Sequence, residues 1–182
     1  EKTPLHKLIH TAQKEAVDSD KQARQFLLLM QWLKSAGYEH YEVSNFALPG
    51  YRSKHNSAYW QGKKYLGLGP SAHSYNGRYR AWNKPNNNLY IRSIADGIIP
   101  QEAEELTPTE ILNETIMISL RTVEGLDLQR VQQQFGKDKK SVLEKGIQKH
   151  LTQQLLQRNG EQVQLTESGM LMADGIAADL FF

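Results

Sequence analysis

The order of elements from Leu106 to the C-terminus restricts the fold more than any other feature of this sequence. A capping box with proline at the first helical position, Thr107-Pro108-Thr109-Glu110, predicts a helix that ends near Arg121. Two further helices are expected, at about 127–136 and 139–153. The run LLQRNGEQVQL then predicts two strands that turn around Asn159-Gly160, a dipeptide that strongly favours a tight hairpin. Three helices followed by a hairpin is the order of a winged helix, so we predict a winged-helix-like C-terminal domain over residues 101–182.

Apolar residues recur at helical spacing in each of these helices, which predicts one buried face per helix. Asp127 is the expected N-cap of the second helix, Leu126 and Val131 are placed to form a hydrophobic staple, and Gly136 ends the helix. A last helix is expected over about 168–180. The positions expected to point inward are Leu112, Ile116, Ser119, Leu120, Leu143, Ile147, His150, Leu151, Met170, Ala173 and Ala177.

The N-terminal part, residues 1–100, predicts a mixture of helices and strands. A helix over about 20–36 is expected to bury a wide face, because Ala23, Phe26, Leu27, Met30 and Leu33 step by three and four. Gly37 follows it, and then residues 41–46 are typical of a strand. A long helix, a glycine and a strand form the second half of a βα unit. We therefore predict an α/β fold, the C-terminal portion of a sheet or barrel whose earlier strands lie outside this chain.

Shorter elements are expected between and before these. A short amphipathic stretch opens the chain, with His6 and His10 as surface residues. Residues 50–84 contain few helix-compatible runs, and 65–69 are expected to form a short strand. A helix is expected over 86–96, and residues 98–105 are expected to be a linker. The inward positions expected for the 86–96 helix are Leu89, Tyr90, Ile94 and Ala95.

The charge of residues 43–95 is distinctive: the segment contains eight Lys or Arg, two His and no Asp or Glu. The whole chain has 22 Lys or Arg and 20 Asp or Glu, so the remainder is net negative. All eight tyrosines lie between Tyr38 and Tyr90. Such a field favours an anionic partner: a carboxylate, a phosphate, a propionate or a nucleic acid. The alternative is a solvated basic loop whose aromatic side chains pack in a core, which is the commoner arrangement for most aromatic residues.

Within this segment, the motif HNxxYW is the candidate ligand site, formed by His55, Asn56, Tyr59 and Trp60. A histidine beside an asparagine in a loop is most often a hydrogen-bonded structural pair. Imidazole and indole together nevertheless suit a flat conjugated ligand, through stacking and through axial ligation of an iron by His55. Arginine and lysine pair with ligand carboxylates, although each one alone is more often a surface charge. The candidates for that role are Arg52, Lys54, Arg78 and Arg80.

A glycine-rich turn follows, in which Gly67 and Gly69 precede Pro70. Glycine lets the backbone approach a ligand closely because it has no Cβ. The turn is not a dinucleotide-binding fingerprint, since the third glycine and the following helix are missing. His73, shortly after the turn, can point into the same pocket as His55 or be a hydrogen-bonded turn residue.

Several classes of protein have no support in the sequence. The chain has no Cys, which excludes disulfides, thiolate zinc sites and iron–sulfur ligation by its own residues. No run approaches 18 apolar residues and no signal-peptide pattern opens the chain, so we expect neither a transmembrane segment nor a secretory signal, and a cytoplasmic location. Nucleophile-elbow and HExxH motifs are absent, so hydrolase chemistry is not indicated.

Three segments, YEVSNFALPG, SKHNSAYW and YLGLGPSAHS, resemble in order and spacing the C-terminal half of the oxygen-independent coproporphyrinogen III oxidase-like family of radical S-adenosylmethionine proteins. The HNxxYW motif is typical of the haem-chaperone (HemW) branch of that family. The opening EKTPLHKL is similar to the family's E-G-T-P-L segment, with Lys2 where glycine is usual. The three helices, the hairpin and the LTESG helix are similar to the family's last domain, so the resemblance spans the whole chain.

The resemblance implies that residues 1–100 are the last part of an incomplete parallel β/α barrel. In that family a CxxxCxxC loop holds a [4Fe–4S] cluster, which binds S-adenosylmethionine. Because this chain has no Cys, the cluster would belong to residues that precede it, and the chain alone should be inactive. By position in the motifs, the resemblance implies cofactor contacts at Ser57, Gly67, Gly69, Ala72 and His73. It implies haem or substrate contacts at His55, Asn56, Tyr59, Trp60, Arg52 and Lys54.

Haem binding and transfer to a haem-accepting protein is the function that the resemblance favours. Two alternatives stay open: oxidative decarboxylation of coproporphyrinogen III, and nucleic-acid binding by the winged-helix-like domain. The last is the weakest, because Glu144 interrupts the lysines of the third helix and no arginine is placed to read a guanine edge. A homodimer is also expected, because missing barrel strands would leave an unpaired strand edge near Val43 and an uncovered helix face.

Overall fold

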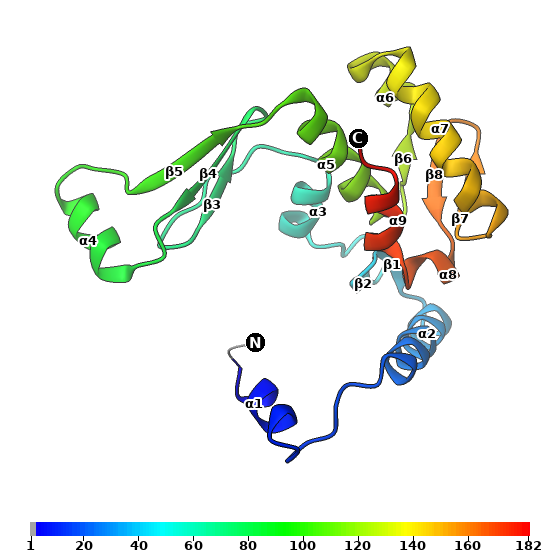
Figure 1. The fold of residues 1–182 in the computed structure, drawn as a ribbon, viewed down its shortest axis with the longest axis horizontal. Coiled ribbons are helices and arrows are strands. Elements are labelled where there is room, and N and C mark those ends of the chain that lie inside the picture. Colours follow the sequence, from blue (N-terminus) through cyan, green and yellow to red (C-terminus); the bar gives the residue numbers. More distant parts are fainter. Residues whose placement is uncertain (1–2) are drawn as a thin grey trace.

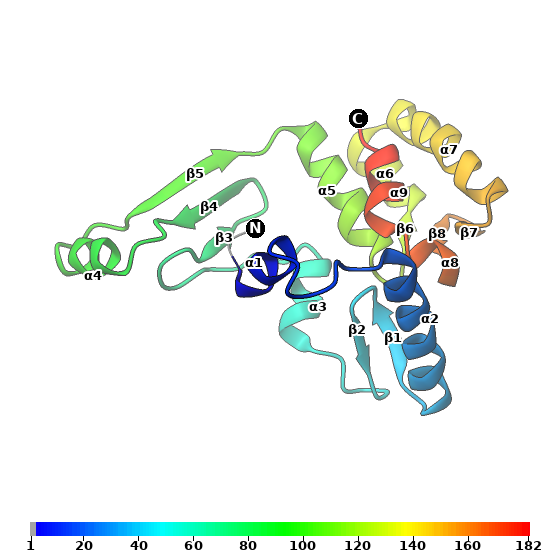
Figure 2. The ribbon, with the colours of Figure 1, turned by 60° about the horizontal axis from the view of Figure 1, so that its bottom comes forward.

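Residues 3–182 are described by a computed structural model (Figure 1). Glu1 and Lys2 lie outside the described residues, and so does the expectation that concerns Lys2. The C-terminal elements gather in one group, from which a three-stranded sheet extends to one side, while the first helix stands apart (Figures 1 and 2). The chain exposes 12466 Å². A compact monomer of this mass exposes about 8,900 Å². The N-terminal elements are therefore spread out rather than wrapped around a core.

The C-terminal group contains the elements predicted from Leu106 onward. Helices α5 (Pro108–Leu120), α6 (Leu128–Phe135) and α7 (Lys137–Thr152) precede the hairpin of β7 (Leu156–Asn159) and β8 (Gln162–Leu165). A short strand, β6 (Leu126–Asp127), adds to β8, so that the antiparallel sheet has the order β6–β8–β7. The Thr107–Glu110 capping box is confirmed, as is the Asp127 cap.

The main cluster of buried hydrophobic residues lies in this group. Nearly all the inward positions expected there are buried, but Ser119, Leu151 and Met170 are only half-buried. The hairpin turn is one residue later than predicted, because Asn159 pairs with Gln162 and Gly160 takes the positive φ of 61°. The expected last helix is broken into α8 (Glu167–Met170) and α9 (Ala173–Asp179). The core residues are Leu112, Ile116, Leu120, Leu126, Leu128, Val131, Leu143, Ile147, Leu156, Val163, Leu165, Ala173, Ile176, Ala177 and Leu180.

The N-terminal helices are α1 (Pro4–His10), which carries both exposed surface histidines, and α2 (Ser19–Ser35). The wide buried face predicted for α2 is wrong: Met30 is its one buried residue. Leu27 is 42% exposed and Trp32 is 63% exposed. The amphipathic spacing is present, and Ala23, Phe26 and Leu33 are half-buried, so the described residues cover this face only in part.

The single strand expected over 41–46 is a hairpin of two strands, β1 (Glu39–Glu42) and β2 (Asn45–Ala47). Every strand pair within residues 3–182 is antiparallel, so the parallel pairing expected of a barrel portion is absent from them. The edge near Val43 is also not free, because the Val43 N–H donates to the carbonyl of Arg121 at 2.9 Å. What the structure shows is a mixed α/β fold.

A second antiparallel sheet joins β3 (His73–Tyr75), β4 (Tyr79–Asn83) and β5 (Gln101–Glu105) in that order. The linker predicted over 98–105 is therefore wrong in its second half, and the strand predicted over 65–69 is reduced to one bridge between Tyr65 and Tyr75. Helix α4 (Asn87–Ala95) begins at its Asn86 cap as predicted. Its expected inward positions are exposed except for Tyr90, which is half-buried.

No helix within residues 3–182 is long and apolar enough to cross a membrane.

Candidate functional site

The HNxxYW motif forms helix α3 (Lys54–Trp60), whereas the sequence analysis placed it in a loop. Ser53 starts the helix, since its side chain accepts a hydrogen bond from the Asn56 N–H at 3.2 Å. Residues four apart in a helix share one face. His55 and Tyr59 therefore meet edge to face, with ring centroids 4.9 Å apart. The spacing of the motif thus positions the imidazole against a tyrosine rather than against the neighbouring Asn56.

Further tyrosines continue this contact. Tyr59 packs edge to face on Tyr65 with centroids 4.7 Å apart, and Tyr65 lies 6.1 Å from Tyr75 on β3. We call His55, Tyr59, Tyr65 and Tyr75 the aromatic row. His55 at its end is exposed, so that its imidazole is accessible to a ligand. The expectation that most aromatic residues pack in a core is wrong for the tyrosines, of which Tyr41 is the buried one.

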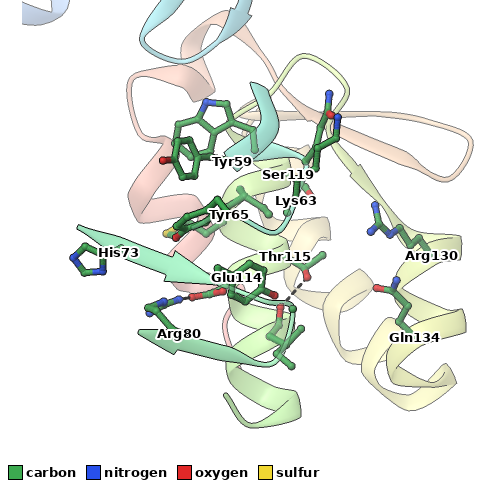
Figure 3. Close-up of a pocket in the computed structure, with 18 residues that line it drawn as sticks. Tyr59, Lys63, Tyr65, His73, Arg80, Glu114, Thr115, Ser119, Arg130 and Gln134 are labelled. Carbon is green, nitrogen blue, oxygen red and sulfur yellow. Dashed lines mark hydrogen bonds and ion pairs between the residues drawn. The ribbon is translucent and has the colours of Figure 1, made fainter. Parts of the chain in front are cut away.

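A cavity of about 660 Å³ lies beside the aromatic row, between α3, α5 and α6 (Figure 3). Tyr59, Tyr65 and His73 lie to one side of it, and Arg130 and Gln134 of α6 lie to the other. Ligand-binding pockets commonly have volumes of about 300–1,000 Å³. The cavity is therefore large enough for a drug-sized or cofactor-sized molecule.

A second cavity of about 630 Å³ opens on the other side of α3. Arg52, Lys54 and Ser57 line it, together with Glu124. The two cavities have lining residues in common, so they form one groove around the C-terminal end of α3. The shared residues are Trp60, Gln61, Lys63, Ser119 and Arg130.

Trp60 lies between the two cavities and lines both of them. The guanidinium of Arg121 lies 5.1 Å from the centroid of the Trp60 indole ring, which is a cation–π contact. The indole N–H is buried and has no hydrogen-bond partner within residues 3–182. Trp60 was predicted as a ligand contact, and its position between the cavities is compatible with that role.

The glycine-rich turn is packed against its own chain. A Cβ on Gly67 would lie 2.7 Å from the carbonyl carbon of His73, so the close approach that glycine permits is to β3. The side chain of Asn83 donates to the Gly69 carbonyl at 2.8 Å, and the Gly69 N–H donates to the Tyr90 hydroxyl at 3.1 Å. The turn's polar groups are therefore used inside the fold.

The five candidate cofactor residues do not converge on one cavity. His73 lines the first cavity and Ser57 lines the second. Gly67, Gly69 and Ala72 line neither, and the Ala72 carbonyl accepts a hydrogen bond from the Asn83 N–H at 2.9 Å.

Acidic residues from outside the acid-free segment neutralise much of its charge. Strand β5 carries Glu102, Glu104 and Glu105, which pair with Lys84, Arg80 and Arg78 of and around β4. Arg80 also pairs with Glu114 of α5. Oppositely charged side chains thus face each other across the β4–β5 pair, which stabilises the pairing.

Arg52, predicted to meet a ligand carboxylate, is already held by two carboxylates of the chain. Its guanidinium donates to Glu124 at 2.7 Å and to Glu39 at 2.9 Å. These contacts, with the Glu124 hydrogen bond first, raise the pKa of Arg52. Lys54, by contrast, forms no ion pair with another described residue and lines the second cavity.

Sequence reasoning missed Lys63, Tyr65 and Arg130 as site residues. Lys63 and Tyr65 lie just beyond the motif, and their place in the acid-free aromatic run was the signal available. Arg130 belongs to α6, far along the sequence, and no local pattern marks it. Its position at the groove is a consequence of how α6 packs on α5.

The described residues contain no group of three or more His, Asp or Glu that could hold a metal ion. An iron–sulfur cluster does not fit this chain, which has no Cys to ligate it. A haem carried as cargo fits better, because it needs one accessible imidazole and flat aromatic contacts. His55 with Tyr59 provides the imidazole and the first of those contacts.

Comparison with known proteins finds one matching family model and several similar proteins. The HemN C-terminal domain family matches residues 106–172. The chain is 32% identical over 179 residues to haem chaperone HemW of Mycobacterium tuberculosis, which covers 98% of this chain and 44% of that protein. It is 29% identical over 177 residues to haem chaperone HemW of Bacillus subtilis, covering 96% of this chain and 46% of that protein.

A mouse relative and a solved structure extend this similarity. Mitochondrial radical S-adenosyl methionine domain-containing protein 1 of Mus musculus is 34% identical over 130 residues, which cover 65% of this chain and 29% of that protein. The structure of coproporphyrinogen III oxidase HemN from Escherichia coli, described as a radical SAM enzyme, matches with a TM-score of 0.64 at 20% identity, over 84% of this chain and 39% of that one. This chain spans less than half the length of each of these proteins.

Proposed function

We propose that the chain is the C-terminal part of a haem-binding protein that passes haem to a haem-accepting protein. The match of residues 106–172 to the HemN C-terminal domain family supports the proposal, as does the similarity of 98% of the chain to a HemW protein. The observation that carries the proposal is the arrangement of α3. The exposed imidazole of His55 contacts Tyr59 edge to face, and Tyr59 and Trp60 line the groove, whereas His55 itself lines neither cavity.

Each residue of the motif has a distinct role in this proposal. His55 supplies an axial nitrogen to the haem iron, and Tyr59 and Trp60 supply flat surfaces for the macrocycle. Lys54 faces a haem carboxylate. Asn56 acts through the backbone, since its N–H closes the Ser53 cap that starts the helix.

The proposal divides the chain into two units. We propose that residues 106–182 form a winged-helix-like domain, with α5, α6 and α7 followed by the β7–β8 hairpin. Strand β5 belongs with the N-terminal unit because it pairs with β4 along its whole length. Helix α2 and β1 would then be the end of a barrel, with its parallel strands, its [4Fe–4S] cluster and its S-adenosylmethionine site held mainly by residues outside this chain.

The second candidate function is oxidation of coproporphyrinogen III, which is supported by the match of residues 106–172 to the HemN C-terminal domain family. Mixing the protein in its natural full length with coproporphyrinogen III, S-adenosylmethionine and a reductant separates the two. Formation of a vinyl product would overturn the transfer proposal. Nucleic-acid binding is disfavoured by charge pairing, since Lys140, Lys149 and Arg158 each form an ion pair with a carboxylate of the same unit.

Haem titration of the full-length protein tests the proposal directly. The variant His55→Ala is expected to shift the Soret band and to weaken haem retention, because it removes an axial bond. His10→Ala, an exposed histidine on α1, is the control and should leave the spectrum unchanged. Equal spectra and equal haem retention in His55→Ala and the wild type would contradict the role of His55.

A further inference from the structure

We propose that the groove around α3 binds a pair of carboxylates through Lys54, Lys63 and Arg130, and that these carboxylates are the propionates of a porphyrin-type ligand. The inference rests on the proposed function for the identity of the macrocycle. It assigns the anion-binding role to three residues outside the HNxxYW motif, two of which, Lys63 and Arg130, were not singled out from the sequence.

Lys54, Lys63 and Arg130 share two properties: they form no ion pair within the described residues, and they line the second cavity. Of the eight Lys and Arg in residues 43–95, Arg52, Arg78, Arg80 and Lys84 are paired with carboxylates. Lys54 and Lys63 form no ion pair with another described residue, and neither does Arg130 of α6. All three line the second cavity. The fold thus uses most of its carboxylates elsewhere and leaves unpaired cations where the groove is.

The carboxylate of Glu124 does not neutralise this cavity. Glu124 is the acidic residue among its lining, and its Oε1 already accepts from Arg52 Nη1 at 2.7 Å. Placing cations of one sign around a concavity raises the local concentration of an anion. Arginine suits a carboxylate in particular, because its fork of N–H donors can make two parallel hydrogen bonds.

The three cations are placed so that a flat ligand lying along α3 could contact all of them. Lys54 is the first residue of the helix and Lys63 follows its end, while Arg130 approaches from α6. The two cavities share Trp60, Lys63 and Arg130, so an edge of a macrocycle in the first cavity reaches the cations of the second. Figure 3 shows Arg130 across the first cavity from Tyr59 and Tyr65. The aromatic side of the groove therefore suits the ring, and the cationic side suits its carboxylates.

Metal-free protoporphyrin IX and its dimethyl ester are the probes that test this. The two differ only at the propionates, which are charged carboxylates in the diacid and neutral methyl esters in the diester, and neither forms an iron–imidazole bond. In fluorescence titrations the full-length wild type should bind the diacid about tenfold more tightly than the diester. The double variant Lys63→Gln/Arg130→Gln should lose that preference, with the diester affinity unchanged. Higher salt should weaken diacid binding to the wild type, because exposed charges are screened.

The control is Lys64→Gln/Arg92→Gln, which removes two unpaired cations that line neither cavity and should keep the diacid preference. Equal binding of diacid and diester by the wild type, or an equal loss in the control, would overturn the inference. Circular dichroism verifies that each variant is folded. The diacid preference could depend on Lys63 and Arg130 while the His55→Ala variant keeps the wild-type Soret band. That pair of results would overturn the proposed axial ligand and would support this anion-binding site.

Discussion

The carboxylate of Glu42 lies 3.0 Å from the guanidinium of Arg121, and this pair attaches the β1–β2 hairpin to the C-terminal group. Glu42 is 1% exposed although it is an acidic residue. Its second oxygen accepts from the Ser44 N–H at 3.0 Å and from Asn45 Nδ2 at 2.5 Å. Arg121 also pairs with Asp174 of α9 at 2.8 Å. Because Arg121 stacks on Trp60 as well, one arginine joins the hairpin, α3 and the core.

Removal of Glu42 should therefore be costly. Breaking one side of a buried ion pair typically costs about 3–5 kcal/mol, and we expect Glu42→Ala to lower the free energy of unfolding by about 3 kcal/mol because Arg121 is partly solvated. Urea unfolding followed by circular dichroism measures this. The matched control is Glu167→Ala, which breaks the exposed Lys34–Glu167 pair and should cost at most about 1 kcal/mol. Similar losses for both variants would show that the buried pair has no special role.

The C-terminal elements could be predicted because their signals are local. The Thr107 capping box and the Asp127 cap each act within a few residues, and the structure contains both. The Asn159-Gly160 signal also marks the hairpin, although the turn lies one residue later. The N-terminal elements were harder. Strand β5 reads QEAEE, with no apolar alternation, and it is a strand because its carboxylates meet the cations of β4. The paired residues are 18 to 26 positions apart in the sequence, so no local pattern indicates this pairing.

The candidate site was predictable in part for the same reason. His55, Tyr59 and Trp60 form a sequence motif, and their helix brings Tyr59 and Trp60 to the groove, while His55 contacts Tyr59 but lines neither cavity. Arg52 carries the same charge as Lys54, yet its carboxylate partners come from β1 and from the turn before β6, and the sequence alone does not indicate which cation stays free. Arg130 reaches the groove only through the packing of α6.

Gly67 should not tolerate a side chain. A Cβ at this position would collide with the backbone of His73, which cannot rotate away as a side chain can. Gly67→Ala is expected to cost about 1–3 kcal/mol, the usual range for overpacking. Gly175→Ala is the control, because α9 leaves open space around Gly175 and alanine favours a helix, so stability should rise by up to about 1 kcal/mol. Thermal melts of both variants decide the point, and an unchanged melting temperature for Gly67→Ala would show that the turn can open.

Acid should destabilise the C-terminal group through His150. The residue is 4% exposed, and its Nδ1 has no hydrogen-bond partner within residues 3–182. Burial lowers the pKa of His150, although Asp179, 3.5 Å from its Nε2, acts in the opposite direction. The pKa of a histidine in an unfolded chain is about 6.5. As the pH falls below that value, the unfolded chain takes up a proton that the native chain resists, so stability present at neutral pH is lost.

The measurement is the fall in melting temperature between pH 7.5 and pH 5. His150→Gln should make this fall smaller than in the wild type, although the variant will be less stable at neutral pH. His10→Gln, exposed on α1, should keep the wild-type fall. A wild-type fall that His150→Gln leaves unchanged would place the acid sensitivity elsewhere.

The exposed apolar side chains of α2 should make this 182-residue chain associate when it is produced alone. Leu28 is 41% exposed and Trp32 is 63% exposed, and Leu27 and Leu29 are each 42% exposed, so four large apolar side chains are exposed on this one helix. Contiguous apolar surface of this kind marks an interaction site or an aggregation liability. Sedimentation velocity should show association that increases with concentration, and Leu28→Gln/Trp32→Gln should reduce it. Val142→Gln on α7, which removes an exposed apolar residue of another helix, should not. A monodisperse monomer at every concentration would mean that the α2 face is covered by the chain itself in solution.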